Sequence, residues 1–151
     1  MPSFRTIRTV PYSAKEMFDL VADIERYPEF LPLCEKTVNR KRKTIAEGVE
    51  TLFSTMTVGY KAVYESFSTN VTLDQKNMLI LCEYVDGPFK YLENRWNFKE
   101  NGKGCDVEFY ITYEFKSFTL GILMGVMFDK VFRRFADVFV SRAEELYGKN
   151  R

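Results

Sequence analysis

The side chains that most often carry out chemistry near neutral pH are sparse in this sequence. It contains no histidine, the commonest general base and transition-metal ligand in proteins. Its cysteines, Cys34, Cys82 and Cys105, are odd in number and show no Cys-x-x-Cys spacing, which argues against a disulfide framework or a zinc site. We therefore expect no metal, no catalytic cofactor, and cysteines that serve as small core residues in a reducing compartment.

Carboxylates are the remaining candidates for acid and base catalysis. Several lie in segments that alternate polar and apolar residues, namely Glu65, Glu83, Glu93, Glu108 and Glu114. Such alternation places most of them on the solvent-facing side of a sheet. Because no nucleophile motif accompanies them, we expect no catalytic residues and a protein that is not an enzyme.

Aromatic side chains are more informative. The 151 residues include 14 Phe and 9 Tyr, more than a compact core of this size needs. Near the C-terminus, Met and Phe recur at helical spacing along one stripe that includes Met124, Phe128 and Phe132. Flexible Met side chains tolerate a ligand of irregular shape, so the stripe predicts one wall of an apolar cavity. An ordinary packed core is the alternative.

The elements that position these residues follow from hydrophobic periodicity. Residues 3–10 form a strand, and Ser13 with Glu16 forms a capping box that starts a helix. Pro28 and Pro32 make residues 24–33 a short, kinked helix or turn. Period-two alternation then predicts strands at about residues 34–42, 45–57, 62–73, 78–85, 89–99 and 105–115. A helix over residues 117–147 follows.

Glycine marks several boundaries. Asn101-Gly102 predicts a two-residue hairpin turn, because the favoured turn needs positive φ at both central residues. We expect Gly59 at a bend or turn and Gly148 as a left-handed cap of the last helix. Gly121 and Gly125 weaken the first turns of that helix by about 1 kcal/mol each relative to alanine, so we expect mobility there.

The order strand, helix, short helix, six strands, long helix predicts an α+β fold. One antiparallel sheet of about seven strands that grips the long C-terminal helix buries every apolar face with few elements. Residues 1–151 are too few for two full cores, so we expect one domain. The longest apolar run, Phe118 to Phe128, is shorter than the roughly 20 residues that span a bilayer, so we expect no transmembrane segment.

Five segments resemble a known family, in order along nearly the whole chain. They are Tyr27-Pro28-Glu29-Phe30-Leu31-Pro32-Leu33-Cys34, Thr57-Val58-Gly59-Tyr60, Gly87-Pro88-Phe89 with Leu92 and Trp96-Asn97-Phe98, Tyr113-Glu114-Phe115-Lys116-Ser117, and Arg142-Ala143-Glu144-Glu145-Leu146-Tyr147-Gly148. The chain resembles the coenzyme-Q-binding branch of the START superfamily, which is polyketide-cyclase-like. Position 33 is often Trp in that family and is Leu33 here, so that ring is missing.

The resemblance implies a helix-grip (START/Bet v 1-like) fold, with a curved antiparallel sheet around the C-terminal helix, and a lipid-sized cavity. Bacterial members are described either as ubiquinone-binding helpers of respiration or as RatA, a toxin proposed to block association of ribosomal subunits. The first description predicts a carrier for ubiquinone or a related isoprenoid lipid that supports respiratory electron transport. The second predicts a ribosome-associated toxin or regulator of translation, and both alternatives stay open. The weakest implication of the resemblance is a polyketide cyclase-like enzyme.

An apolar cavity suffices to bind a polyprenylated quinone, since each buried methylene contributes about 0.8 kcal/mol. Tyr60, Tyr64, Tyr113 or Asn94 could supply hydrogen bonds to its carbonyls. The predicted ligand-binding residues are Phe30, Leu31, Leu33, Val58, Tyr60, Tyr64, Phe89, Leu92, Trp96, Phe109, Ile111, Tyr113, Met124, Met127, Phe128, Val131, Phe132 and Phe135.

Two surface segments predict contacts outside the cavity. The apolar loop at residues 29–32 is either a gate or membrane-touching lip, or a loop tucked onto the core. The basic run at residues 40–43 either contacts anionic lipid or ribosomal RNA, or is a solvated hairpin that protects a sheet edge. A net charge of +1 gives no general attraction to nucleic acid, so we expect no DNA partner. We expect a cytoplasmic protein with transient contacts to the inner membrane surface or the large ribosomal subunit.

Overall fold

The computed structural model describes residues 3–60 and 63–148. Along the chain the elements are β1 (Ser3–Val10), α1 (Ala14–Ala22), the 3₁₀ helix η1 (Ile24–Glu29), β2 (Cys34–Ala46), β3 (Val49–Tyr60), β4 (Val63–Asp74), β5 (Leu79–Asp86), β6 (Phe89–Glu100), β7 (Cys105–Phe115) and α2 (Phe118–Tyr147). This is the predicted order of strand, helix, short helix, six strands and long helix. The α+β fold class is therefore confirmed.

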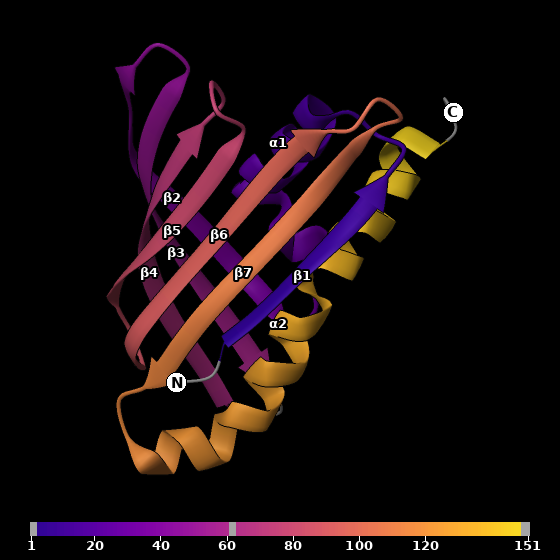
Figure 1. Cartoon of the computed structure of the whole chain (residues 1–151). Helices are drawn as coiled ribbons and strands as arrows, with labels where there is room; N and C mark the ends of the chain where they lie inside the picture. Colours follow the sequence, from indigo (N-terminus) through magenta and orange to yellow (C-terminus); the bar gives the residue numbers. More distant parts are fainter. Residues whose placement is uncertain (1–2, 61–62, 149–151) are drawn as a thin grey trace.

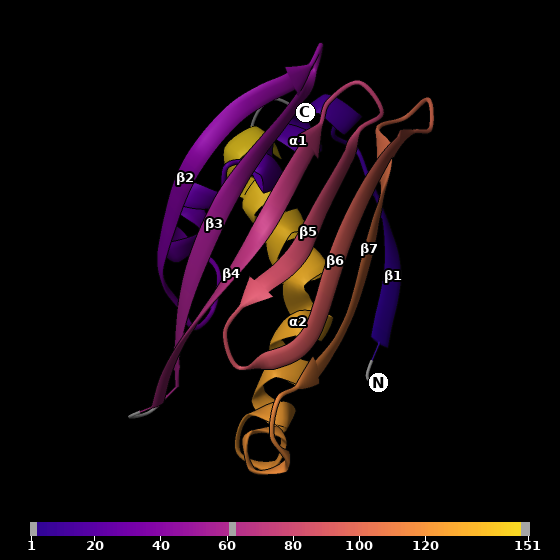
Figure 2. The ribbon, with the colours of Figure 1, turned by 90° about the vertical axis from the view of Figure 1, so that its left-hand side faces the viewer.

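The strands form one antiparallel sheet in the order β1-β7-β6-β5-β4-β3-β2. The first strand pairs with the last, so β1 and β2 are the two edges. Figures 1 and 2 show that the sheet curves around α2, which runs along its concave side, while α1 lies near one end. The predicted grip of a curved sheet on the C-terminal helix is confirmed.

The predicted capping box starts α1. The Ser13 side chain accepts a hydrogen bond from the Glu16 backbone N–H at 3.0 Å, and the Glu16 carboxylate accepts one from the Ser13 N–H at 2.9 Å. Two of the otherwise unpaired donors at the helix start are thereby satisfied. Met17 and Val21 are completely buried, so the helix is fixed by packing as well as by its cap.

The long helix α2 buries one stripe of side chains against the sheet. Met124, Phe128, Phe132 and Phe139 are each 4% exposed or less. Ser117 caps the helix by accepting a hydrogen bond from the Leu120 N–H at 3.0 Å. No helix of the described part has the length and apolar character needed to cross a bilayer.

The predicted boundary between the second and third strands was wrong. Instead of breaking after residue 42, β2 continues to Ala46. A β-bulge shifts the register with β3 between Arg40 and Lys43, and Lys41 there adopts a left-handed conformation (φ 55°). Pairing with β3 continues beyond the bulge. The turn falls at Gly48, whose φ of 76° suits glycine.

The predicted hairpin of β6 and β7 is confirmed, but its predicted two-residue turn and the predicted left-handed cap at Gly148 were wrong. The β6–β7 connection is a loop from Asn101 to Gly104, because the last strand pair joins Glu100 to Cys105. Only Gly102 in it has positive φ, 85°, and the Asn101 side chain accepts a hydrogen bond from the Lys103 N–H at 3.0 Å. Gly148 has φ −60° and ψ −33°, so it continues the right-handed helical conformation and is no left-handed cap.

Gly59 lies within β3 and not at a turn. It pairs with Tyr64 on β4, and an added Cβ at Gly59 would lie 2.6 Å from a carbon of the Tyr64 ring. The glycine thus makes room for an aromatic ring across the strand pair. Close packing, and not chain reversal, explains this glycine.

Candidate functional site

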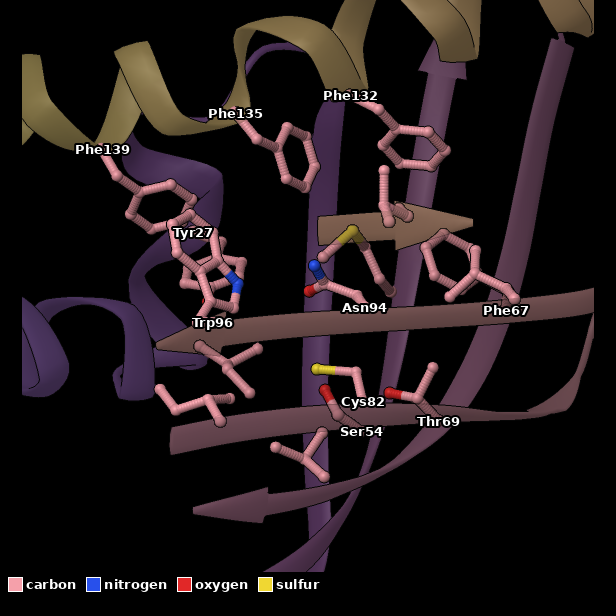
Figure 3. Close-up of a pocket in the computed structure, with 16 residues that line it drawn as sticks. Tyr27, Ser54, Phe67, Thr69, Cys82, Asn94, Trp96, Phe132, Phe135 and Phe139 are labelled. Atoms are coloured by element: carbon pink, nitrogen blue, oxygen red, sulfur yellow. The ribbon is translucent and has the colours of Figure 1, made fainter. Parts of the chain in front are cut away.

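A cavity of about 60 Å³ lies between the concave face of the sheet and α2. Five strands, η1 and the C-terminal half of α2 contribute to its walls (Figure 3). Its lining comprises Ile24, Tyr27, Ser54, Met56, Phe67, Thr69, Val71, Ile80, Cys82, Leu92, Asn94, Trp96, Ile111, Phe132, Phe135 and Phe139. Most of these side chains are apolar or aromatic.

Three phenylalanines of α2 form the roof of the cavity. Figure 3 shows Phe132, Phe135 and Phe139 pointing from the helix toward the sheet. Phe139 packs edge-on against Tyr27 of η1 and Trp96 of β6, with ring centroids 5.1 Å apart in both pairs. These contacts close one end of the cavity and hold the roof in place.

The floor carries a row of neutral polar side chains, Ser54, Thr69, Cys82 and Asn94, which we call the polar row. Ser54 on β3 is the direct register partner of Thr69 on β4, and Cys82 on β5 is that of Asn94 on β6. Ser54, Thr69 and Asn94 are 5%, 7% and 8% exposed. The row therefore crosses four neighbouring strands beneath the aromatic roof (Figure 3).

The polar row keeps unused hydrogen-bonding capacity. The Asn94 amide N–H donates to the Tyr110 carbonyl of β7 at 3.0 Å, which turns its own carbonyl oxygen toward other partners. The hydroxyls of Ser54 and Thr69 make no hydrogen bond within the described part of the chain. Buried polar groups usually have partners, so these groups suit a guest with carbonyl or hydroxyl oxygens.

The cavity is electrically neutral near pH 7. Its lining contains no Asp, Glu, Lys or Arg. Burial raises the pKa of the Cys82 thiol to about 12, with Glu83 adding to the effect. Burial also raises the pKa of Tyr27 well above its usual value, and its hydroxyl donates to the Val21 carbonyl. Such a site favours an uncharged ligand over an ionised one.

The predicted ligand-binding residues divide into groups by position. Those in the cavity lining are Leu92, Trp96, Ile111, Phe132 and Phe135. Buried nearby, in the aromatic core that supports the lining, are Phe89, Phe109, Tyr113, Met124 and Phe128. Asn94, predicted as a hydrogen-bonding group, lies in the polar row.

The other predicted residues do not line the cavity. Leu31 and Val58 are buried in the core, and the half-buried residues are Phe30, Leu33, Met127 and Val131. Tyr64 is 63% exposed, so its hydroxyl faces away from the cavity, and the side chain of Tyr60 lies outside the described residues. At residues 29–32, Phe30 packs on Phe139 at 5.2 Å and Leu31 is 4% exposed, so this loop is tucked onto the core.

Sequence reasoning missed most of the polar row. Ser54 and Thr69 alternate with apolar residues of the same face, such as Leu52 on β3 and Val71 on β4. A search for polar residues at core-facing positions of the strands could have found them. Apolar periodicity does not identify Ser54 and Thr69, because these polar residues interrupt the apolar pattern of their strands.

Among the described residues, no group of three or more His, Cys, Asp or Glu side chains could hold a metal ion. The curved sheet, the gripped helix and the neutral cavity between them define a START-like, helix-grip protein. The chain belongs to the family described as polyketide cyclase / dehydrase and lipid transport, whose model matches residues 10–140. The resemblance predicted from the sequence is confirmed.

Several relatives extend over nearly the whole chain. The ribosome association toxin RatA of Rickettsia prowazekii is 31% identical over 97% of this chain and 99% of its own. Coenzyme Q-binding protein COQ10 homolog B, mitochondrial, of Xenopus laevis is 28% identical over 94% of this chain and 58% of its own. The solved 18 kDa protein CC1736 of Caulobacter crescentus matches with a TM-score of 0.79 and 30% identity over 98% of this chain and 99% of its own. These relatives carry the names of a toxin and a binding protein and not of enzymes.

Proposed function

We propose that this protein binds a neutral isoprenoid lipid, ubiquinone or a related quinone, in the cavity between the sheet and α2 and acts as a carrier that supports respiratory electron transport. The observation that carries this proposal is the polar row on the floor of an otherwise apolar cavity. A quinone needs a few neutral hydrogen-bonding groups for its ring and apolar side chains for its tail. The cavity offers both kinds of group.

Both redox states of a quinone find partners in the polar row. The hydroxyls of Ser54 and Thr69 can donate to the carbonyl oxygens of the oxidised form. The carbonyl oxygen of Asn94 can accept from the hydroxyls of the reduced form, since its amide N–H is engaged by Tyr110. The name of the Xenopus relative, a coenzyme Q-binding protein, supports the same ligand class.

The cavity must enlarge to admit such a ligand. Ligand pockets usually measure about 300–1,000 Å³, whereas this one measures about 60 Å³. The roof belongs to α2, which contacts the sheet through side chains, so outward movement of α2 would open the cavity without breaking strand pairing. Gly121 and Gly125 near the start of α2 lower the cost of such a movement.

The test is the lipid content of the protein after expression in a quinone-producing host. We expect organic extracts of the purified protein to contain a prenyl quinone by mass spectrometry. A Thr69→Phe variant, which fills the cavity from its floor, should carry at least about tenfold less. Thr72→Phe, on the outer face of the same strand, is the matched control. The proposal fails if the unaltered protein yields no quinone or other prenyl lipid.

A second function, association with the large ribosomal subunit, is favoured by a different observation. Arg40, Lys41, Arg42 and Lys43 are all exposed on the edge strand β2, where a bulge interrupts the pairing with β3. Arg42 pairs with Glu50 at 2.7 Å, whereas Arg40 and Lys43 form no ion pair within the described residues. Free cations on an edge suit a phosphate backbone, and the Rickettsia relative carries the name of a ribosome association toxin.

Salt-dependent co-sedimentation with large ribosomal subunits tests this second function. We expect binding at low salt that Arg40→Gln/Lys43→Gln abolishes, since each phosphate contact steepens the salt dependence. Lys99→Gln/Lys103→Gln removes the same charge from another exposed site and should leave binding intact. A protein that stays in the supernatant at low salt would exclude this function.

A further inference from the structure

The first three turns of α2 are apolar on every side. From Phe118 to Phe128 the helix has no charged residue, and the charges begin at Asp129. Its inner side, with Met124 and Phe128, is buried in the core. Its outer side carries Phe118, Ile122, Leu123 and Val126, which are 86%, 63%, 72% and 67% exposed. We call these four residues the apolar patch.

The apolar patch is unusual for a surface helix. A helix that is apolar all round is normally buried in protein or in lipid, and contiguous exposed apolar surface marks an interaction site. An open groove of about 960 Å³ between the end of β7 and this part of α2 enlarges the patch, because Phe118, Ile122 and Val126 also line the groove. Figures 1 and 2 place these turns beyond the end of β7, at the end of the molecule opposite the β6–β7 loop.

The groove lining has three lysines and two carboxylates, an excess of one positive charge. Its two acidic residues are engaged, Glu114 with Lys90 at 3.8 Å and Asp129 with Arg133 at 3.0 Å. Lys116 and Lys130, which also line the groove, are exposed and form no ion pair within the described part of the chain. The apolar patch is therefore bordered by two free cations.

We propose that the apolar patch, with Lys116 and Lys130, docks the protein on the surface of an anionic lipid bilayer. Apolar side chains enter the boundary between headgroups and acyl chains, and lysines beside them attract anionic headgroups. A second copy of this chain fits less well, because a symmetric contact through the patch would bring like-charged lysines together. This docking surface is separate from the tucked loop at residues 29–32.

Docking at this surface would bring the cavity close to its lipid source. Tyr113 lines the open groove and packs on Phe132, which lines the cavity, with ring centroids 5.0 Å apart. This ring contact joins the wall of the groove to the wall of the cavity. Docking on the bilayer does not depend on which ligand the cavity binds. The docking proposal can therefore be tested separately from the carrier function.

Co-sedimentation with vesicles of defined composition tests the proposal with the full chain. We expect binding to phosphatidylcholine vesicles that contain about a third phosphatidylglycerol, and much weaker binding to phosphatidylcholine alone. Ile122→Glu should lower the partition coefficient at least about tenfold. Ile7→Glu changes an isoleucine that is 57% exposed on β1 and should have little effect. Circular dichroism of both variants is the control for folding.

The lysines are tested in the same way. Lys116→Gln/Lys130→Gln should weaken binding by about fivefold for each lysine at low salt, and Lys99→Gln/Lys103→Gln should not. The proposal is overturned if the protein does not bind anionic vesicles, or if Ile7→Glu weakens binding as much as Ile122→Glu does. It is also overturned if only Arg40→Gln/Lys43→Gln abolishes binding, or if Ile122→Glu only disrupts a self-associated dimer.

Discussion

Cys82 lies directly opposite Asn94 in the register of β5 and β6, and both side chains line the floor of the cavity. If the cavity binds a quinone as proposed, a Cys82 thiolate beside the ring would attack it as a nucleophile and hold the quinone covalently. The thiolate and not the thiol is the nucleophile, so the protonation state of Cys82 decides whether binding stays reversible. Burial keeps this thiol protonated.

Cys82 should therefore resist alkylation in the folded protein. Raising its pKa from 9.0 to about 12 lowers the thiolate fraction near pH 8 roughly a thousandfold. Burial likewise raises the pKa of Cys34 and Cys105 to about 11. We expect slow labelling of all three by iodoacetamide at pH 8 and fast labelling in urea, measured by peptide mass spectrometry. Rapid labelling of Cys82 in the folded protein would contradict the described burial.

Trp96 should report ligand binding directly. It is the single tryptophan of the chain, lines the cavity and is 3% exposed. A quinone in the cavity would contact the indole, so titration with a short-chain ubiquinone should quench the fluorescence by about half or more at saturation. Asn94→Leu should weaken binding about tenfold by removing a polar partner. Asn97→Leu, on the outer face of the same strand, should bind as the unaltered protein does.

Phe139 should be among the residues most important for stability. It is completely buried and packs against Tyr27, Trp96 and Phe30, with ring centroids between 5.1 and 5.2 Å away. Phe139→Ala should lower the free energy of unfolding by about 3–5 kcal/mol in urea titrations. Phe118→Ala, at a site that is 86% exposed, should change it by less than about 0.5 kcal/mol.

Arg142 should anchor η1 to α2. Its side chain is 16% exposed, donates to the Glu29 carboxylate at 2.8 Å and lies over the Phe30 ring at 5.0 Å. Arg142→Met should cost about 1 kcal/mol of stability, measured by thermal unfolding, because it removes both contacts. Arg134→Met is the matched control, because Arg134 is an exposed arginine of the same helix that forms no ion pair within the described residues. It should leave the stability nearly unchanged. Equal effects of the two variants would show that the contacts to Glu29 and Phe30 contribute nothing.

The fold could be predicted because its elements rest on local patterns. The alternation from Val107 to Phe115 identified β7 within its observed bounds, and the Ser13–Glu16 box identified the start of α1. The end of β2 could not be predicted in this way. Its continuation depends on a bulge at Lys41, within a run of cations that carries no periodicity.

The cavity was predicted less completely than the fold. Aromatic residues of the stripe, such as Phe132 and Phe135, were placed on its wall by helical spacing together with the aromatic excess and the family resemblance. The pairing of Ser54 with Thr69 depends on strand register, which is set by pairing across the sheet and not by either segment. Tyr64 could have been excluded, because it falls on the opposite face of β4 from Phe67 and Thr69.

The apolar patch and the aromatic roof occupy different turns of α2 and share no residue, since the patch ends at Val126 and the roof begins at Phe132. Under the two proposals, one continuous helix carries two separate surfaces, one that contacts the bound lipid and one that contacts the bilayer. Under these proposals, substitutions in the apolar patch would change which surface the protein binds and leave the bound lipid unchanged. Substitutions of the roof residues Phe132, Phe135 and Phe139 would change the bound lipid and leave bilayer binding unchanged.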